Sequence, residues 1–390
     1  MRASGGASGR REGGSVYFPQ IKPAALTLTR ASVSSPELDL VRLAARADLD
    51  PERAQAFRRA AEQPLDWTLA VRLAQYHRLV PLLFVHLRDH APAAPEEIVS
   101  ALHGAVRKTS VHVLFLSSEM ARVARCLEAD GIPYLVFKGP SLAEAYGSVA
   151  KRPFVDNDIL VRREYFGQVE RALADLGFAT QKRSDRQQSG YLWVHGEYTF
   201  RRMAGAARSA VDVHTNLVPF GFSYAPSFQE LRQRACTLDL AGTSVPVLGW
   251  NDLFLTLSVN ALKDQWDRLR LATDLAEVAR LVDDWDAVQA QAAQLGCRRA
   301  VHLAVAVAAD EVGGEFPPGL IRQSRQDRRA QALARRARTF FETSAETRVR
   351  SGRGRAGLNL LVQDGLRGQL RYSGFAAVRR AMERWVDPGA

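Results

Sequence analysis

Apolar side chains follow two different spacings along this chain. Over residues 36–47, 66–90 and 96–130 they recur every three or four positions, the spacing that places them on one face of an α-helix. Ser35 precedes the first segment and is expected to cap it, because a serine hydroxyl accepts from the free N–H groups of a first helical turn. The pattern therefore predicts a helical N-terminal region over residues 36–130.

Between residues 131 and 248 the spacing changes to that of a small α/β block. Short apolar runs predict strands, and an amphipathic segment that ends at Gly177 predicts a helix covering them. The expected strands are residues 132–137, 154–161, 190–202 and 209–217, and the expected helices are residues 141–147 and 162–178.

Helical spacing returns over residues 249–320, where Asn251 or Asp252 is expected to cap the first helix. Residues 321–390 are rich in arginine and are predicted to be mostly helical, with a break at "SGRGRAG". Residues 1–35 contain Gly, Ser and Arg without apolar periodicity and are predicted to be disordered. The predicted fold class is mixed α+β, with a small sheet and its flanking helices embedded between helical N-terminal and C-terminal regions.

Composition narrows the class of protein. The chain has 390 residues and three scattered cysteines, which argue against a disulfide framework and against a zinc ribbon. No apolar run approaches the roughly 18 residues of a membrane span, and the N-terminus lacks an apolar signal core. We therefore expect a soluble, cytoplasmic protein.

The net charge of +11 is concentrated near the ends of the chain. Residues 321–390 carry sixteen arginines and six acidic residues, a net charge of +10, and the first thirty residues add +4. Such a basic segment is a candidate for binding RNA or another anionic surface. A solvated helical face is the simpler interpretation, so an RNA partner stays an open alternative.

Candidate functional residues lie in the stretch from Phe137 to Val161. Asp156 and Asp158 stand two positions apart in the expected strand 154–161, so their side chains point to one face and that of Asn157 to the other. Two such carboxylates repel each other unless a cation lies between them, and Mg²⁺ accepts oxygen ligands of this kind. A third carboxylate is available at Asp212, two residues before a histidine.

A Lys-Gly pair precedes these acids, between an expected strand and a short helix. Backbone N–H groups and the cation of Lys138 in such a turn can hold phosphate groups. Each feature alone has an ordinary explanation, as a turn glycine, a surface lysine or a solvent-facing acid. Their order along the chain, with a third acid on a later strand, favours a metal-dependent phosphate site.

These motifs resemble a known family. "FKGPS", "KRPFVDNDILV" and "VDVHTNL" are similar to the Lys-Gly turn, the Arg-Pro step with its Asp-x-Asp pair, and the later acidic-x-His motif of the bacterial "uncharacterised nucleotidyltransferase" family. More broadly, the sequence resembles the nucleotidyltransferases of the DNA polymerase β superfamily. The resemblance covers roughly residues 35–314 and implies a nucleotidyltransferase-type sheet. The sequence departs from the family pattern at Pro140, Asn157, Asp212 and Asn260.

The resemblance implies roles for seven residues. Asp156, Asp158 and Asp212 would bind two Mg²⁺ ions and carry the catalysis. Gly139 and Ser141 would line the phosphate turn, and Lys138 and Arg152 would face the triphosphate. The implied substrates are ATP or another NTP and an unidentified hydroxyl-bearing acceptor.

Three functions are compatible with these residues. The first is Mg²⁺-dependent transfer of a nucleoside monophosphate to a small molecule, peptide or protein, with release of pyrophosphate. The second is a nucleotide-binding module in which catalysis is weakened or lost, which the departures at Pro140 and Asn157 motivate. The third is an RNA-directed or tRNA-directed nucleotidyltransferase, which the basic C-terminal segment motivates.

Overall fold

The computed structural model of the chain describes residues 35–180, 190–192, 195–205, 207–218, 221–342 and 363–386. The predicted disorder of the N-terminal segment, Ser35 apart, and the predicted break at "SGRGRAG" lie outside these residues. The expected helical region begins where the pattern placed it. Ser35 is the N-cap of the first helix, and its Oγ accepts from the backbone N of Leu38 at 3.2 Å.

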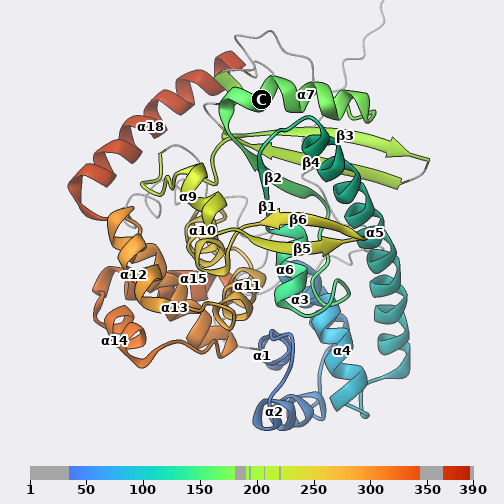
Figure 1. The fold of residues 1–390 in the computed structure, drawn as a ribbon. Coiled ribbons are helices and arrows are strands. Elements are labelled where there is room, and N and C mark those ends of the chain that lie inside the picture. Colours follow the sequence, from blue (N-terminus) through green and yellow to red (C-terminus); the bar gives the residue numbers. More distant parts are fainter. Residues whose placement is uncertain are drawn as a thin grey trace, which may run out of the picture.

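The N-terminal region consists of helices, as predicted. The last of them, α5, is 34 residues long and runs beside the sheet (Figure 1). The helices are α1 (Pro36–Leu43), α2 (Pro51–Ala61), α3 (Trp67–His77), α4 (Val80–His90) and α5 (Glu96–Ala129).

One six-stranded mixed sheet forms the middle of the molecule, with the order β3-β4-β2-β1-β6-β5. Strand β2 runs antiparallel to β1 and parallel to β4, so β2 lies between the Lys-Gly turn and the strand that carries the third acid. The strands are β1 (Tyr134–Phe137), β2 (Asn157–Val161), β3 (Glu197–Ala204), β4 (Ala207–His214), β5 (Cys236–Leu240) and β6 (Thr243–Val247).

The two faces of the sheet contact different partners. Side chains that alternate along β2 and β4, such as Ile159 and Val211, pack with apolar residues of α5 and α7. Leu160 belongs instead to the larger core that includes residues of the N-terminal and C-terminal helices. Because strand side chains alternate, Asp158 and Asp212 project on the face away from α5.

Three segments differ from the prediction in the sheet region. The expected strand 154–161 begins only at Asn157, so Asp156 lies just before the strand and not within it. The expected strand 190–202 begins only at Glu197, and residues 190–192 and 195 are helical instead. The hairpin of β5 and β6 was not predicted, because its alternation is interrupted by a turn at 241–242 and by Pro246. The helical elements here are α6 (Gly139–Ala145), η1 (Arg163–Tyr165), α7 (Phe166–Asp175) and α9 (Phe228–Gln233).

The C-terminal region is helical, as predicted, but its first helix is capped differently. Gly249 is the N-cap of α10, and neither Asn251 nor Asp252 takes that role. Asp252 is buried and accepts two hydrogen bonds from the Arg234 guanidinium. The helices are α10 (Trp250–Lys263), α11 (Leu269–Ala279), α12 (Trp285–Gln294), α13 (Arg298–Val312), α14 (Pro318–Gln326), α15 (Arg328–Glu342) and α18 (Gly365–Val386).

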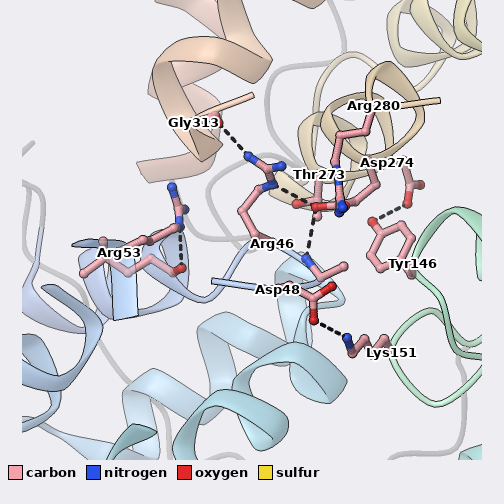
Figure 2. A network of polar contacts seen from close by, with 12 residues as sticks. Arg46, Asp48, Arg53, Tyr146, Lys151, Thr273, Asp274, Arg280 and Gly313 are labelled. Carbon is pink, nitrogen blue, oxygen red and sulfur yellow. Dashed lines mark hydrogen bonds and ion pairs between the residues drawn. The ribbon is translucent and has the colours of Figure 1, made fainter. Parts of the chain in front are cut away.

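Polar contacts join the N-terminal helices, the α6 segment and α11 (Figure 2). Arg46 donates to Glu277 at 2.8 Å and to the carbonyl of Gly313 at 2.6 Å. Lys151 donates to Asp48 at 2.6 Å. These contacts bring α11 close to the segment that follows the Lys-Gly turn. In the described part of the chain, no helix combines the length and the hydrophobicity that a membrane crossing requires.

Candidate active site

The register of the sheet places two of the predicted acids side by side. Asp158 on β2 pairs with Asp212 on the parallel strand β4, and with Phe137 on β1. Asp156 lies just before β2 and interacts electrostatically with both other carboxylates. The three acids predicted from the sequence are therefore neighbours, although Asp156 and Asp212 are separated by 55 residues along the chain.

Asp158 is held by two cationic or hydrogen-bonding partners. Lys138 Nζ lies 3.5 Å from Asp158 Oδ1, and His214 Nε2 lies 2.9 Å from the same oxygen. Burial by itself would raise the pKa of Asp158, but the Lys138 charge and the His214 contact outweigh it and lower the pKa to about 2. Asp158 is therefore a permanent anion at neutral pH.

The other two acids have the opposite shift. Burial raises the pKa of Asp156 to about 7, and repulsion from Asp158 and Asp212 adds to the shift. Burial and then Asp158 also raise the pKa of Asp212. The three carboxylates therefore lie so close together that their negative charge is not fully compensated. An uncompensated negative charge of this kind attracts a cation.

A second layer of residues supports His214. Its Nδ1 lies 3.6 Å from Glu197 Oε2, and Lys263 Nζ lies 3.3 Å from the same Glu197 oxygen. The Phe137 ring meets the imidazole edge-on, with ring centroids 4.9 Å apart. His214 is thus fixed in position beside Asp158.

The Lys-Gly turn lies directly against the acidic segment. Lys138 and Gly139 both adopt positive φ, at 58° and 27°, so the chain turns sharply from β1 into α6. A Cβ on Gly139 would lie 3.3 Å from the backbone oxygen of Asp156 and 3.6 Å from the Phe154 ring. Glycine is needed here both for its backbone conformation and for the close approach of the acid-bearing segment.

Two further predicted residues have different environments. Ser141 is fully buried, and its Oγ has no hydrogen-bond partner in the described structure. Arg152 is also buried and forms a two-pronged contact with Asp274 of α11, at 2.6 and 2.9 Å. Its guanidinium therefore faces α11 in this structure, and its predicted contact with a triphosphate stays a prediction.

A match to a known family model identifies the family of this chain. The family model described as "Uncharacterised nucleotidyltransferase" matches residues 63–313, a range that contains every acid and turn residue described above. The chain belongs to this nucleotidyltransferase family. The family expected from the sequence motifs is thereby confirmed, whereas the assignment to the DNA polymerase β superfamily stays a prediction.

Other comparisons add little to this family assignment. No curated protein matches the chain. Among solved structures, the chain is similar to an antigenic nucleotidyltransferase-like protein from Paracoccidioides brasiliensis, with 14% identity and a TM-score of 0.31. That match covers 53% of this chain and 96% of the other.

The donor set of this nucleotidyltransferase suits a hard cation, although a finished metal centre is not assembled. Within the described residues, no group of three or more His, Cys, Asp or Glu side chains is arranged to hold a metal ion as it stands. The donors themselves are carboxylates, the ligands that Mg²⁺ prefers. In addition, Asp212 Oδ1 is buried without a hydrogen-bond partner in the described structure. An unsatisfied buried oxygen of this kind fits a metal ligand.

Sequence reasoning missed several charged residues around the acids. Glu197 and Lys263 come from β3 and α10, and Arg78 and Arg270 interact electrostatically with Asp156 from α3 and α11. Lys263 and Arg270 lie in the segment "ALKDQWDRLRLATDLAEV" of the predicted helical region 249–320, and its helical spacing does not mark either residue as part of a site. No spacing rule connects Arg78 with that segment, because their proximity is created by the tertiary fold.

Proposed function

We propose that this protein transfers a nucleoside monophosphate from an NTP to an acceptor hydroxyl, with release of pyrophosphate and with Mg²⁺ as the cofactor. The acceptor is a small molecule, a peptide or a protein. Membership of the nucleotidyltransferase family supports the reaction class. The single observation that carries the proposal is the register that sets Asp158 beside Asp212, with Asp156 next to both.

In this proposal the three acids hold the metal ions. Asp156, Asp158 and Asp212 would be the ligands. Bound Mg²⁺ would neutralise the phosphate oxygens and lower the pKa of the acceptor hydroxyl. The raised pKa of Asp212 suits a group that also accepts a proton. The acceptor oxygen would bond to the α-phosphorus, its proton would pass to Asp212, and the bond from the α-phosphorus to the pyrophosphate oxygen would break.

The Lys-Gly turn is assigned to the phosphate chain of the nucleotide. Lys138 supplies a charge beside Asp158, Gly139 lets the acid-bearing segment approach the turn closely, and the buried Ser141 hydroxyl is unpartnered in the described structure. Pro140 removes one N–H donor from this turn. Arg152 could contact phosphate only if it released Asp274. We therefore assign the phosphate contact to Lys138, Gly139 and Ser141.

The test measures Mg²⁺-dependent NTP binding by titration calorimetry and nucleotidyl transfer by incorporation of α-labelled NTPs into a cell extract. We expect binding and incorporation by the wild-type protein. Asp156→Ala, Asp158→Ala and Asp212→Ala should each lower incorporation by at least about a hundredfold. Asp283→Ala is the control, because Asp283 is an exposed acid before α12. Failure of the wild-type protein to bind any NTP with Mg²⁺ would rule out the proposal.

A nucleotide-binding module without catalysis is the second candidate. The ion pair between Lys138 and Asp158 favours it, because this pair occupies an oxygen that a metal ligand would need. The two candidates separate in single-turnover assays. A binding module holds the NTP with Mg²⁺ and yields no pyrophosphate and no labelled product with any fraction of the extract.

The RNA-directed alternative rests on exposed arginines of α14 and α15, among them Arg322, Arg329 and Arg336. Truncation at residue 320 is unsuitable as a test, because Leu333 and Phe341 of α15 belong to the main core. Replacing the three named arginines by Gln retains the core. If the protein acts on RNA, this triple variant should weaken RNA binding and flatten its salt dependence.

A further inference from the structure

Two arginines from distant parts of the chain meet beside the acids. Arg78 follows α3 in a left-handed conformation, with φ of 58°. The preceding residue, His77, accepts a hydrogen bond through Nδ1 from the backbone N of Leu269, at 3.2 Å. Arg270 follows Leu269, and the two guanidinium groups repel each other. The end of α3 and the start of α11 thus place Arg78 and Arg270 together.

Arg270 also interacts with the carboxylate of Asp274 in α11, but that carboxylate already has hydrogen-bond partners. Asp274 accepts two hydrogen bonds from Arg152 and a third from the Tyr146 hydroxyl at 2.7 Å. Figure 2 shows the phenol of Tyr146 directed at this carboxylate. In the described part of the chain, Asp274 is therefore matched by Arg152, and Arg270 is an additional cation beside a completed pair.

The additional cation is poorly compensated. Arg270 Nε is buried without a hydrogen-bond partner in the described structure. Burial, and then the neighbouring Arg152, lower the pKa of Arg270 to about 9, so the group is still charged at neutral pH. Burial and then Arg268 lower the pKa of Arg78 as well. Arg270 is half-buried, and a guanidinium whose Nε is buried without a partner is unfavourable, so this geometry calls for an anion.

Two further carboxylates interact with the arginine pair. Asp267 interacts with Arg78 and also forms an ion pair with Arg268. Asp156 interacts with both Arg270 and Arg78. Lys138 also interacts with Asp156 and lies 3.5 Å from Asp158. Positive charge therefore reaches Asp156 from two sources, the Lys-Gly turn and the arginine pair of the helical regions.

We propose that Arg78 and Arg270 form a phosphate-binding subsite next to Asp156, built by the helical regions and separate from the Lys-Gly turn. The forked guanidinium of arginine matches phosphate oxygens with two hydrogen bonds. The subsite stands on the geometry of these residues, and its assignment to a substrate of nucleotidyl transfer rests on the proposed function. The phosphate belongs either to the NTP or to a phosphorylated acceptor.

The first experiment measures binding of inorganic tripolyphosphate by titration calorimetry, without Mg²⁺ and without nucleotide. Arg270→Met and Arg78→Met should each lower the affinity by about tenfold or more, since charge-assisted hydrogen bonds are lost. Arg88→Met is the matched control, because Arg88 is an exposed arginine paired with Asp89 on α4. Wild-type affinity in both test variants, or no binding by the wild-type protein, would overturn the proposal.

A thermal melt separates loss of binding from loss of folding. Arg270→Met should melt at the same temperature as the wild-type protein or higher, because it removes a half-buried cation whose buried Nε has no partner in the described structure. Tripolyphosphate should raise the melting temperature of the wild-type protein more than that of the variant. A variant that melts several degrees lower would show that the protein itself compensates the guanidinium, which contradicts the subsite.

A nucleotide series then identifies the source of the phosphate. If the NTP supplies it, Arg270→Met removes the preference of the protein for ATP over AMP. If a phosphorylated acceptor supplies it, the variant weakens tripolyphosphate binding and leaves ATP binding unchanged. Tripolyphosphate binding that depends on Arg270 in a protein without transfer activity would support the subsite and refute the proposed function. Transfer activity together with unchanged tripolyphosphate binding in both variants would do the reverse.

Discussion

The interior polar network around α11 and the acidic cluster of Asp156, Asp158 and Asp212 differ in how their charges are matched. In the interior network, Glu277 accepts from Arg46, from the backbone N of Ala47 and from Arg280, and Asp274 accepts from Arg152 and Tyr146. In the acidic cluster, Asp156 and Asp212 face like charges, and Asp212 Oδ1 is unpartnered in the described structure.

This difference separates structural charges from functional ones. A buried charge whose hydrogen bonds are complete fixes the positions of helices without seeking a ligand. A crowded group of like charges lowers stability and is retained where a ligand of opposite charge completes it. By this criterion Asp274 is structural, although it is as deeply buried as Asp158, and the acids and Arg270 are functional candidates.

The largest expected effect comes from breaking the matched cluster. Asp274→Ala leaves Arg152 and Tyr146 buried without their shared acceptor, so the free energy of unfolding should fall by about 3–5 kcal/mol. Chemical denaturation measures the change. Glu164→Ala is the control, because it removes an exposed ion pair with Arg162 and should change stability by less than about 1 kcal/mol. Equal effects of the two variants would contradict the distinction.

An intermediate effect of opposite sign is expected in the acidic cluster. The pKa of Asp156 is about 7 in the folded protein, above its usual value of 3.8, so the folded state binds the proton more tightly than the unfolded state. Stability contributed by that proton is therefore lost as pH rises from about 4 to about 7. Asp156→Asn should raise the free energy of unfolding on the order of 1 to 2 kcal/mol at pH 8, in metal-free protein.

The pH dependence of the stability gain tests whether Asp156→Asn is stabilising for this reason. The gain of Asp156→Asn should be small near pH 4 and grow until about pH 7, and urea denaturation across that range measures it. Asp158 has the opposite shift, to about 2, so its contribution is present above pH 4 and is lost in acid. A variant that destabilises the metal-free protein at pH 8 would contradict the crowding of the acids.

The smallest expected effect lies on the other face of β2. Asn157 is fully buried, its Nδ2 donates to the carbonyl of Leu116 at 3.1 Å, and its Oδ1 is unpartnered in the described structure. Asn157→Leu removes one hydrogen bond and one unsatisfied oxygen together, so stability should change by no more than about 1 kcal/mol. Nucleotidyl transfer, if present, should be unchanged. A loss above about 2 kcal/mol would contradict this local balance.

Local sequence features predicted much of the site. The Lys-Gly turn, the Asp-x-Asp pair and the acid before His214 could be recognised because strand alternation and turn chemistry operate over a few residues. The helix cap at Ser35 and the end of the helix at Gly177 follow from the same short range. Where the local pattern was weak or mixed, the prediction was wrong or missing. The strand expected at 190–196 is not a strand, and the hairpin of β5 and β6 was not predicted.

Pairings across long stretches of chain could not be predicted in this way. The pairing of Arg152 with Asp274, 122 residues away, is one example, and the predicted contact of Arg152 with a triphosphate stays a prediction. Asp252 looked like a helix cap, but burial and Arg234 give it another role. In both cases a charged partner distant in sequence decides the environment, and no local pattern contains that information.

By itself, the sequence determined the residue types of the candidate site and their order: a Lys-Gly turn, two acids two positions apart at the start of a strand, and a third acid on a later strand. Only the tertiary structure decided which charges are matched. It placed Asp158 beside Asp212, used Asp274 to hold Arg152, and left Arg270 next to Asp156 with a buried nitrogen unpartnered among the described residues. The physical reason is that alternation and turn geometry act between near neighbours, whereas compensation of a buried charge depends on whichever distant segment packs against it.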